Sequence, residues 1–339
     1  MPAASVRPSN GDLHVGLVAC CLNAEHVRGM GRYVYELVRQ SDGLAPVSWT
    51  LYGEDPRRPL RQPPARQVQA KVFPFRGDRF HLWEQIGLPR QARRDAVQVL
   101  HCTEGSLPWW QPVPTVVTVH DTLAWDERPD TAVERAYLDH LQVAALHRCA
   151  AVVTISESSR RDIVAKWPRL ADKLTVIPHG IADDCFLDDA AELPAALQTT
   201  VGGAPYAVYV GGPMARKRFD WALKVLADQP AQDLHLVACG FGAAARESAS
   251  ATVPAGLRQR VHFAPFLEDA ELRRLYRGAV AVLYPTLYEG FGFPVVEAHA
   301  AGVPCLFSAV GSLAELVGPL SFVVGTEDLP AWGAALARA

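Results

Sequence analysis

The 339-residue sequence lacks several features that mark whole classes of protein. Its 33 basic and 36 acidic residues leave a formal net charge of only -3, without the basic excess typical of nucleic-acid binding. The seven cysteines form no C-x-x-C pair and lie mostly in or beside apolar runs, which favours reduced, buried thiols and a reducing cytoplasm. The first fifteen residues lack the apolar core of a signal peptide, and no uninterrupted apolar run reaches about 18 residues. Any membrane contact is therefore expected to be peripheral, at the inner face of the cell membrane.

The length and the pattern of the chain predict two α/β domains. One hydrophobic core rarely organises so many residues, so two domains of roughly 150 residues are expected. Short apolar runs alternate with helical patterns in both halves, which predicts parallel sheets covered by helices. Asp188–Pro205 has acids, glycines and prolines without an apolar period, which predicts a boundary between domains 1–190 and 191–339. Two Rossmann-like domains of this kind predict a ligand cleft between them, lined by loops at the carboxyl ends of the strands.

The apolar runs place the individual elements. Strands are predicted near residues 14–19, 113–119, 151–155, 174–177, 207–210, 234–238, 260–263, 279–284 and 303–307. Helices are predicted at 32–39, at 132–148 and after Ser156, where Ser156 and Ser158 are candidate N-caps.

A basic loop follows one predicted strand of the second half. In "YVGGPMARKRFDW", Gly211 and Gly212 turn the chain, and Arg216, Lys217 and then Arg218 precede a helix expected to begin near Phe219. Cations there oppose the helix dipole at roughly 0.3–1 kcal/mol per charge, and a bound anion would reverse that sign. Two interpretations are open: a solvated basic loop, or a diphosphate site formed by Arg216 and Lys217.

Two further strand ends carry candidate residues. "VPTVVTVHD" ends at His120, which opens into the crevice or instead caps the strand with Asp121. In "VRGMGRYVYEL", Gly29 and Gly31 precede a predicted helix, but Val34 occupies the place of the third glycine of a dinucleotide fingerprint. An NAD-type loop is therefore excluded. The glycines permit either tight packing or close approach of a ligand to the backbone.

The stretch "YEGFGFPVVE" holds two carboxylates, Glu289 and Glu297, around Gly290 and Gly292. Pro294 predicts a helix start, so Glu289 is expected in a loop and Glu297 in the first helical turn. The simplest explanations are solvent exposure for the first and a dipole interaction for the second. The alternative is that both accept hydrogen bonds from a polyhydroxylated ligand, with main-chain NH groups of the bend as further donors.

In combination, these stretches resemble the retaining enzymes of glycosyltransferase family 4, which have the GT-B fold of two Rossmann-like domains. The resemblance is carried by "EGFGFPVVE", "GGPMARK", "RGMGRY" and "VTVHD", and is supported by "LWEQIGLP", "VVTISESSRRDI", "VIPHGI" and "GVPCLFSAVGSLAELVG". The motifs run in the family order over nearly the whole chain. Two departures are the end of the chain at Ala339, where family members commonly continue into further helices, and "VHFAPF", where the family more often has glycine before the aromatic residue.

The resemblance implies roles for particular residues. Arg216 and Lys217 would neutralise the donor's diphosphate, Glu289 would bind the transferred sugar, and Glu297 the ribose. His120 would bind the donor sugar, and Gly29 and Gly31 would admit donor phosphate and acceptor. The wider donor-binding set comprises Gly212, Gly240, Phe266, Gly290, Phe291, Gly292 and Phe293, with Gly240 and Phe266 near the base. The mechanism implied is front-face, without a covalent nucleophile, and neither a cofactor nor a metal is expected.

The resemblance leaves the substrates open. The implied reaction moves a hexose from a nucleotide diphosphate sugar to a glycan or lipid-linked saccharide, with mannose and GDP-mannose as the first choices. The rival interpretations are a sugar phosphorylase or nucleotide-sugar epimerase, and an inactive sugar-nucleotide-binding subunit. The arginine-rich segment Arg57–Arg94 is interpreted either as solvated surface or as a surface that attracts anionic lipid head groups.

Overall fold

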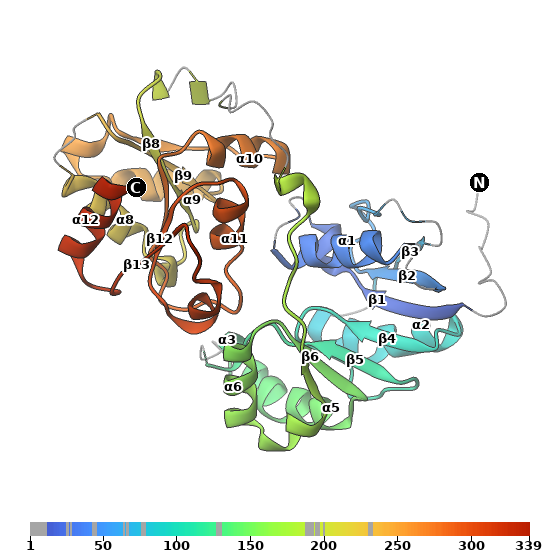
Figure 1. The fold of residues 1–339 in the computed structure, drawn as a ribbon. Helices are drawn as coiled ribbons and strands as arrows, with labels where there is room; N and C mark the ends of the chain where they lie inside the picture. Colours follow the sequence, from blue (N-terminus) through green and yellow to red (C-terminus); the bar gives the residue numbers. More distant parts are fainter. Residues whose placement is uncertain are drawn as a thin grey trace. The chain divides into compact units, whose positions relative to one another are not determined.

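A computed structural model gives the fold of the chain (Figure 1). It describes residues 12–24, 27, 29–42, 46–63, 65, 68–75, 79–126, 131–186, 193, 197–198, 201–229 and 233–339. The chain divides into two compact units, Met1–His179 and Gly180–Ala339. The boundary predicted between residues 190 and 191 lies outside the described residues and stays a prediction, as does the interdomain cleft.

The first unit is built on a seven-stranded parallel sheet in the order β3-β2-β1-β4-β5-β6-β7. Its strands are β1 Leu13–Val18, β2 Val47–Gly53, β3 Val68–Val72, β4 Val99–Cys102, β5 Thr115–Thr118, β6 Ala151–Thr154 and β7 Leu174–Val176. Its helices are α1 Gly29–Ser41, α2 Leu88–Arg94, α3 Leu123–Asp126, α4 Ala132–Ala136, α5 Val143–Arg148 and α6 Glu157–Lys166. A wider helical segment, Tyr137–Gln142, joins α4 to α5, so the predicted helix 132–148 is confirmed as a continuous one.

Both faces of this first sheet are buried, as the end of β1 illustrates. Leu17 packs in a cluster with Val34 of α1, whereas the next residue, Val18, packs in a cluster with Leu88 of α2 and Leu100 of β4. Successive strand residues point to opposite faces, so helices must cover both sides of a strand that is apolar throughout.

The second unit repeats this construction on a six-stranded parallel sheet in the order β10-β9-β8-β11-β12-β13. Its strands are β8 Tyr206–Val210, β9 His235–Cys239, β10 Val261–Phe263, β11 Ala281–Tyr284, β12 Cys305–Phe307 and β13 Ser321–Val323. Its helices include α8 Phe219–Ala227, α9 Ala243–Thr252, α10 Asp269–Arg277, α11 Phe293–Ala300 and α12 Leu329–Arg338. Val208 packs with Val295 of α11 on one face, and Tyr209 packs with Trp221 of α8 and Trp332 of α12 on the other. Two parallel-sheet Rossmann-like units are therefore confirmed.

The strand order places the ligand-binding edge of each sheet. The chain winds outward in both directions from a pair of central strands, β1 and β4 in the first sheet and β8 and β11 in the second. In such sheets, ligands bind beyond the carboxyl ends of the strands at the point where the winding reverses. The loops after β8 and β11 are those of the basic loop and the two-glutamate stretch.

Each strand placed from the sequence is observed within two residues of its predicted ends, but β2, β3, β4 and β13 were not predicted. The Ser156 hydroxyl accepts a hydrogen bond from the Ser159 backbone at 3.0 Å, which confirms Ser156 as the N-cap of α6. Ser158 lies inside that helix, so the prediction that it caps the helix is wrong.

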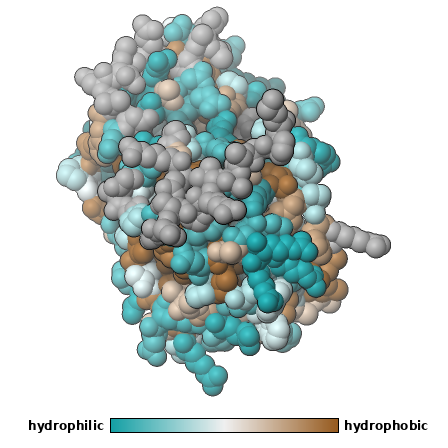
Figure 2. Space-filling view, turned by 90° about the vertical axis from the view of Figure 1, so that its right-hand side faces the viewer, coloured by the Kyte–Doolittle hydropathy of each residue, from teal (hydrophilic) through white to brown (hydrophobic). Residues whose placement is uncertain are grey.

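The surface mixes apolar and polar residues. Brown hydrophobic areas lie between larger teal ones on the face drawn in Figure 2. In the part of the chain that the structure describes, no helix combines the length and the hydropathy needed to cross a membrane.

Candidate functional site

The basic loop is a tight turn that hydrogen bonds from Tyr209 hold in place. The backbone NH of Gly212 donates to the carbonyl of Cys239 at 3.2 Å. The Tyr209 hydroxyl lies 3.1 Å from the Gly212 carbonyl oxygen and 3.3 Å from that of Lys217, so it links both ends of the turn. Arg216 and Lys217 lie in a short 3₁₀ turn, Ala215–Lys217, and α8 begins at Phe219 as predicted.

Gly212 and Gly240 bring the loops after β8 and β9 into backbone contact. Both have positive φ, +63° and +96°. A Cβ on Gly212 would lie 2.6 Å from the Gly240 carbonyl oxygen, and one on Gly240 would lie 2.9 Å from the Gly212 nitrogen. Only glycine fits either position, because a Cβ on one residue would overlap the backbone of the other. Their assignment to donor binding stays a prediction.

Arg218 has a strained backbone next to the basic pair. Its φ of 56° and ψ of 52° place a non-glycine residue in the left-handed region at the N-cap of α8. Such a conformation costs about 1–3 kcal/mol and persists only where the surroundings enforce it. Its guanidinium group lies 4.8 Å from the Trp221 ring centroid and 3.5 Å from Asp220. Trp221 and Asp220 lie on α8, and Arg218 Nη1 also lies 3.8 Å from Glu327 Oε1, in the segment before α12.

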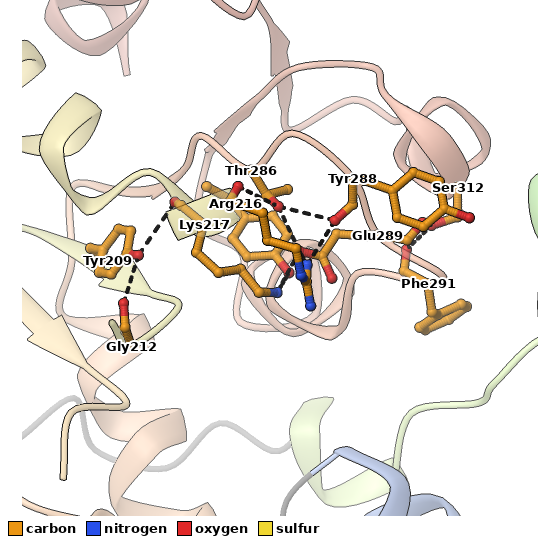
Figure 3. Close-up of polar contacts among 10 residues, drawn as sticks. Tyr209, Gly212, Arg216, Lys217, Thr286, Tyr288, Glu289, Phe291 and Ser312 are labelled. Carbon is orange, nitrogen blue, oxygen red and sulfur yellow. Dashed lines mark hydrogen bonds and ion pairs between the residues drawn. The ribbon is translucent and has the colours of Figure 1, made fainter. Parts of the chain in front are cut away.

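Arg216 and Lys217 converge on the carboxylate of Glu289 (Figure 3). Arg216 Nη1 donates to Glu289 Oε1 at 3.0 Å, Lys217 Nζ donates to the same oxygen, and Thr286 Oγ1 donates to it at 2.7 Å. Arg216 Nη1 also donates to the Tyr288 carbonyl at 2.8 Å. Ion pairs therefore link the loop after β8 to the loop after β11, at the point where the winding of the second sheet reverses.

The burial of this cluster tests the interpretations of Glu289 and of the basic loop as solvent-exposed. Glu289 is 7% exposed, so the interpretation as a solvated carboxylate is wrong. Arg216 and Lys217 are likewise largely buried, at 22% and 13% of their side-chain surface, so a solvated basic loop is excluded too. The three charges sum to +1, and the cluster retains a net attraction for an anion.

Tyr284, at the end of β11, completes this cluster. Lys217 Nζ donates to its hydroxyl at 2.8 Å. Burial, and then the charge of Glu289, raise the pKa of Tyr284 well above its ordinary value, so the phenol stays protonated.

The glycine-rich bend between Glu289 and α11 is held by Ser312. The buried Ser312 hydroxyl lies 2.8 Å from the Glu289 carbonyl oxygen and 2.7 Å from that of Phe291. Gly292 caps α11 with φ of 110°, where a Cβ would lie 2.3 Å from a Leu313 methyl carbon. The rings of Phe291 and Phe293 pack edge to face, 5.2 Å apart, and Gly290 is buried between Glu289 and Phe291.

Glu297 lies deeper than its sequence position indicates. Because α11 begins at Phe293, Pro294 is its second residue and Glu297 its fifth, so the placement of Glu297 in the first turn is wrong. Gly292, rather than a side chain, caps the helix and allows it to begin one residue before the proline. Glu297 is 8% exposed, and Tyr276 of α10 donates to its Oε2 at 3.0 Å. An interaction with the helix dipole therefore does not account for Glu297, which is a buried carboxylate that accepts a hydrogen bond from Tyr276.

His120 lies just beyond β5, at the carboxyl edge of the first sheet. Its Nε2 lies 2.8 Å from the carbonyl oxygen of Thr103, which follows β4. A carbonyl only accepts, so Nε2 carries the hydrogen, and Nδ1 of the neutral ring is an acceptor. The His120 carbonyl accepts from Ser159 Oγ at 2.8 Å. Asp121 instead accepts from the backbone of Leu123 at 3.0 Å.

Aromatic rings surround His120. The rings of Tyr33 of α1 and of His179 lie 5.4 Å from it, centroid to centroid. Burial lowers the pKa of His120, while the Thr103 carbonyl and the charges of Asp121 and Glu104 act in the opposite direction. Burial also lowers the pKa of His179 to about 3. These imidazoles are therefore neutral at pH 7.

The first glycine-rich loop differs from its predicted form. The helix α1 begins at Gly29 and includes Gly31, so the prediction that both glycines precede the helix is wrong. Gly29 starts the helix with a φ of 30°, a backbone conformation that only glycine adopts readily, and a Cβ there would meet no atom within 4 Å. A Cβ on Gly31 would lie 2.6 Å from Val27 Cγ1, which favours tight packing as its function. Phe266 is half-buried in the segment after β10.

Several functional neighbours were missing from the sequence-based set, namely Thr286, Ser312, Tyr276, Tyr284, Thr103 and Ser159. All six carry a hydroxyl group. Five of them end a strand or lie in the segment that follows one, and Tyr276 lies in α10, so their signal in the sequence is only positional. Among the described residues, no group of three or more histidine, cysteine or acidic side chains is arranged to hold a metal ion.

The two parallel-sheet units have the architecture of the GT-B fold. The second unit carries a buried Arg-Lys-Glu cluster with net positive charge, beyond the carboxyl ends of β8 and β11. Residues 27–184 match the family model described as Glycosyltransferase Family 4, and residues 204–339 match the one described as Glycosyl transferases group 1. The D-inositol 3-phosphate glycosyltransferase of Xylanimonas cellulosilytica is 30% identical over 85% of this chain and 77% of its own length. The chain therefore belongs to glycosyltransferase family 4.

Other similarities are more distant. The O-antigen chain mannosyltransferase B of Escherichia coli is 28% identical over 58% of this chain and 52% of its own length. The crystal structure of Anabaena Alr3699/HepE in complex with UDP and glucose aligns with a TM-score of 0.71 over 96% of this chain and 89% of that one, at 14% identity. The last similarity shows the fold alone. The chain spans about half to three-fifths of the length of several curated relatives.

Proposed function

We propose that the protein is a retaining glycosyltransferase that moves a hexose from a nucleotide diphosphate sugar to a glycan or lipid-linked saccharide, in the synthesis of a surface polysaccharide or glycoconjugate. The observation that carries the proposal is the buried contact of Arg216 and Lys217 with Glu289 beyond β8 and β11. Such a cluster offers cations for a diphosphate and a carboxylate for sugar hydroxyls within one small volume. Membership of family 4 supports the same reaction class.

Each charged group has a role in this reaction. Arg216 and Lys217 stabilise the negative charge that develops on the diphosphate as it leaves, and a preorganised, buried pair does so without reorganisation at the moment of reaction. The hydrogen bonds from Arg216, Lys217 and Thr286 end on Oε1 of Glu289, so Oε2 is the oxygen that we expect to accept from a sugar hydroxyl. The bond from the sugar C1 to the phosphate breaks as the acceptor oxygen bonds C1 on the same face. The acceptor proton passes to the leaving phosphate oxygen, so no protein nucleophile and no metal is required.

Mannose is the hexose proposed first, with GDP-mannose as its donor. Support comes from the similarity to a protein named as an O-antigen chain mannosyltransferase. The structure of the similar Anabaena protein contains UDP and glucose, which supports a nucleotide-sugar donor of this general type. The first assay therefore includes GDP-mannose and UDP-glucose in parallel.

The decisive experiment incubates the purified protein with each donor and a saccharide acceptor, then measures free nucleoside diphosphate and the anomeric configuration of the product by NMR. An α-linked product with one nucleoside diphosphate released per transfer is expected. Release of sugar 1-phosphate, epimerisation of the donor, or binding without turnover would overturn the proposal. Glu289→Gln should abolish transfer, whereas Glu247→Gln, which removes an exposed carboxylate on α9, should leave it unchanged.

A further inference from the structure

The loop between β4 and β5 is fastened by three glutamine side chains. Gln142 accepts from the Leu107 backbone NH at 3.1 Å and donates to its carbonyl at 3.1 Å. Gln85 also donates to that carbonyl, at 3.2 Å, and accepts from the Trp109 NH at 2.8 Å. Gln111 donates to the Pro108 carbonyl at 3.0 Å, and Leu107 is fully buried. The loop therefore has a fixed backbone rather than a loose one.

This fixed loop presents two tryptophans to solvent. Trp109 is 45% exposed and Trp110 is 38% exposed. The Arg148 guanidinium, at the end of α5, lies 4.7 Å from the Trp109 ring centroid. Lys173 donates to the carbonyl of the neighbouring His147 at 3.0 Å, so it flanks the same helix end. We call these five residues the tryptophan patch.

The tryptophan patch lies at the edge of the first sheet opposite to His120. The segment with Trp109 and Trp110 leads into the start of β5, whereas His120 follows its end, and Lys173 immediately precedes β7. At 3.3 Å per strand residue, the five steps from Thr115 to His120 span about 17 Å. A partner bound at the patch would therefore leave the strand-end residues uncovered.

We propose that the tryptophan patch docks on the surface of an anionic lipid bilayer. Tryptophan combines a large apolar body with one polar NH, which suits the boundary between head groups and acyl chains. Arg148 and Lys173 add the positive charge that anionic head groups attract, and the single charge of the exposed Asp172, next to Lys173, does not cancel both of them. Because the hydrogen bonds to the loop backbone hold its main chain in place, the rings stay outside the core and are available to the bilayer.

Co-sedimentation of the purified full chain with vesicles tests this proposal without any sugar donor. The vesicles contain phosphatidylglycerol and phosphatidylcholine, or phosphatidylcholine alone. We expect binding to the anionic vesicles that weakens with added salt. The double variant Trp109→Ser/Trp110→Ser should lower the partition coefficient by tenfold or more. Arg148→Gln should lower it about fivefold, the equivalent of roughly 1 kcal/mol for a basic residue near an anionic surface.

The matched control is Phe186→Ser, which removes an aromatic ring that is 60% exposed in the second unit. It should bind vesicles as the unaltered protein does, and all variants should keep their melting temperature and their nucleotide binding. The proposal is overturned if the unaltered protein does not sediment with anionic vesicles, or if the tryptophan double variant still sediments fully. It is equally overturned if light scattering shows that the patch instead holds two copies of the chain together.

Discussion

Replacing Glu289 with glutamine tests the charge cluster directly, because the two side chains have nearly the same shape. The substitution removes the negative charge that Arg216 and Lys217 share and leaves two neighbouring cations in a largely buried place. We therefore expect the Glu289→Gln protein to be less stable than the unaltered protein in the absence of ligand. We also expect it to bind a nucleoside diphosphate more tightly, because the diphosphate restores the missing negative charge.

The structure sets the size of both effects. Removing one partner of a buried ion pair costs about 3–5 kcal/mol. Glutamine still accepts a hydrogen bond, and Arg216 keeps 22% of its side-chain surface exposed, so we expect a loss near 3 kcal/mol. In a unit of this size, such a loss lowers the melting temperature by about 6–12 °C. A lost repulsion across about 6 Å amounts to at most roughly 3 kcal/mol at an effective dielectric constant of 20, and solvent screening reduces the expected gain in affinity to about tenfold.

Thermal unfolding gives the first quantity, and isothermal titration with GDP and UDP gives the second. The exposed Glu247→Gln variant serves as the control and should change neither. An unchanged melting temperature for Glu289→Gln would refute the idea that the carboxylate compensates the two cations. Weaker nucleoside diphosphate binding would refute the idea that the cations receive the diphosphate.

Three further substitutions test separate parts of the two units. Burial lowers the pKa of His101 to about 4, so between about pH 6.5 and 4 the unfolded chain binds a proton that the folded chain does not. The free energy of unfolding should therefore fall as the pH is lowered from 6.5 to 4, by at most about 1.4 kcal/mol per pH unit. The substitution His101→Asn should reduce this slope in urea titrations. Gly212→Ala should cost about 3 kcal/mol or more in thermal unfolding, because its Cβ would lie 2.6 Å from a backbone oxygen, whereas Gly203→Ala, also at positive φ but with nothing within 4 Å, should cost about 1 kcal/mol. Tyr276→Phe removes a donor from Glu297, and the KM for the donor should rise about tenfold with kcat within about twofold in steady-state kinetics; a fall in kcat alone would contradict ribose binding by Glu297.

The regular part of the fold could be predicted because its strands are apolar on both faces. The run in β8, Tyr206–Val210, is almost uniformly buried, and such runs stand out in a sequence. The strands that were not predicted have weaker signals. In β2, Ser48 and Thr50 are buried polar residues inside the strand, and no residue of β3 or β13 is fully buried.

The candidate site could be located but not resolved from the sequence. The strand-to-loop positions of Arg216 and Glu289 were readable, because each follows an apolar run. Their direct contact was not, because 73 positions separate them and only the parallel pairing of β8 with β11 brings them together. The donors Thr286 and Ser312 were missed for the same reason: a hydroxyl in a loop has no sequence signal until its acceptor is known.

The two strand-end clusters differ in charge, and the difference argues for different parts of a donor. The sequence allowed His120 to be protonated and to add positive charge. In the structure its pKa is lowered by burial, and its Nε2 hydrogen is engaged by Thr103, so the neutral ring presents an acceptor at Nδ1. An acceptor repels phosphate oxygens and suits a sugar hydroxyl. The net positive charge at Arg216, Lys217 and Glu289 is therefore where we expect the diphosphate, and a pH-dependent loss of sugar binding should follow protonation of His120 in acid.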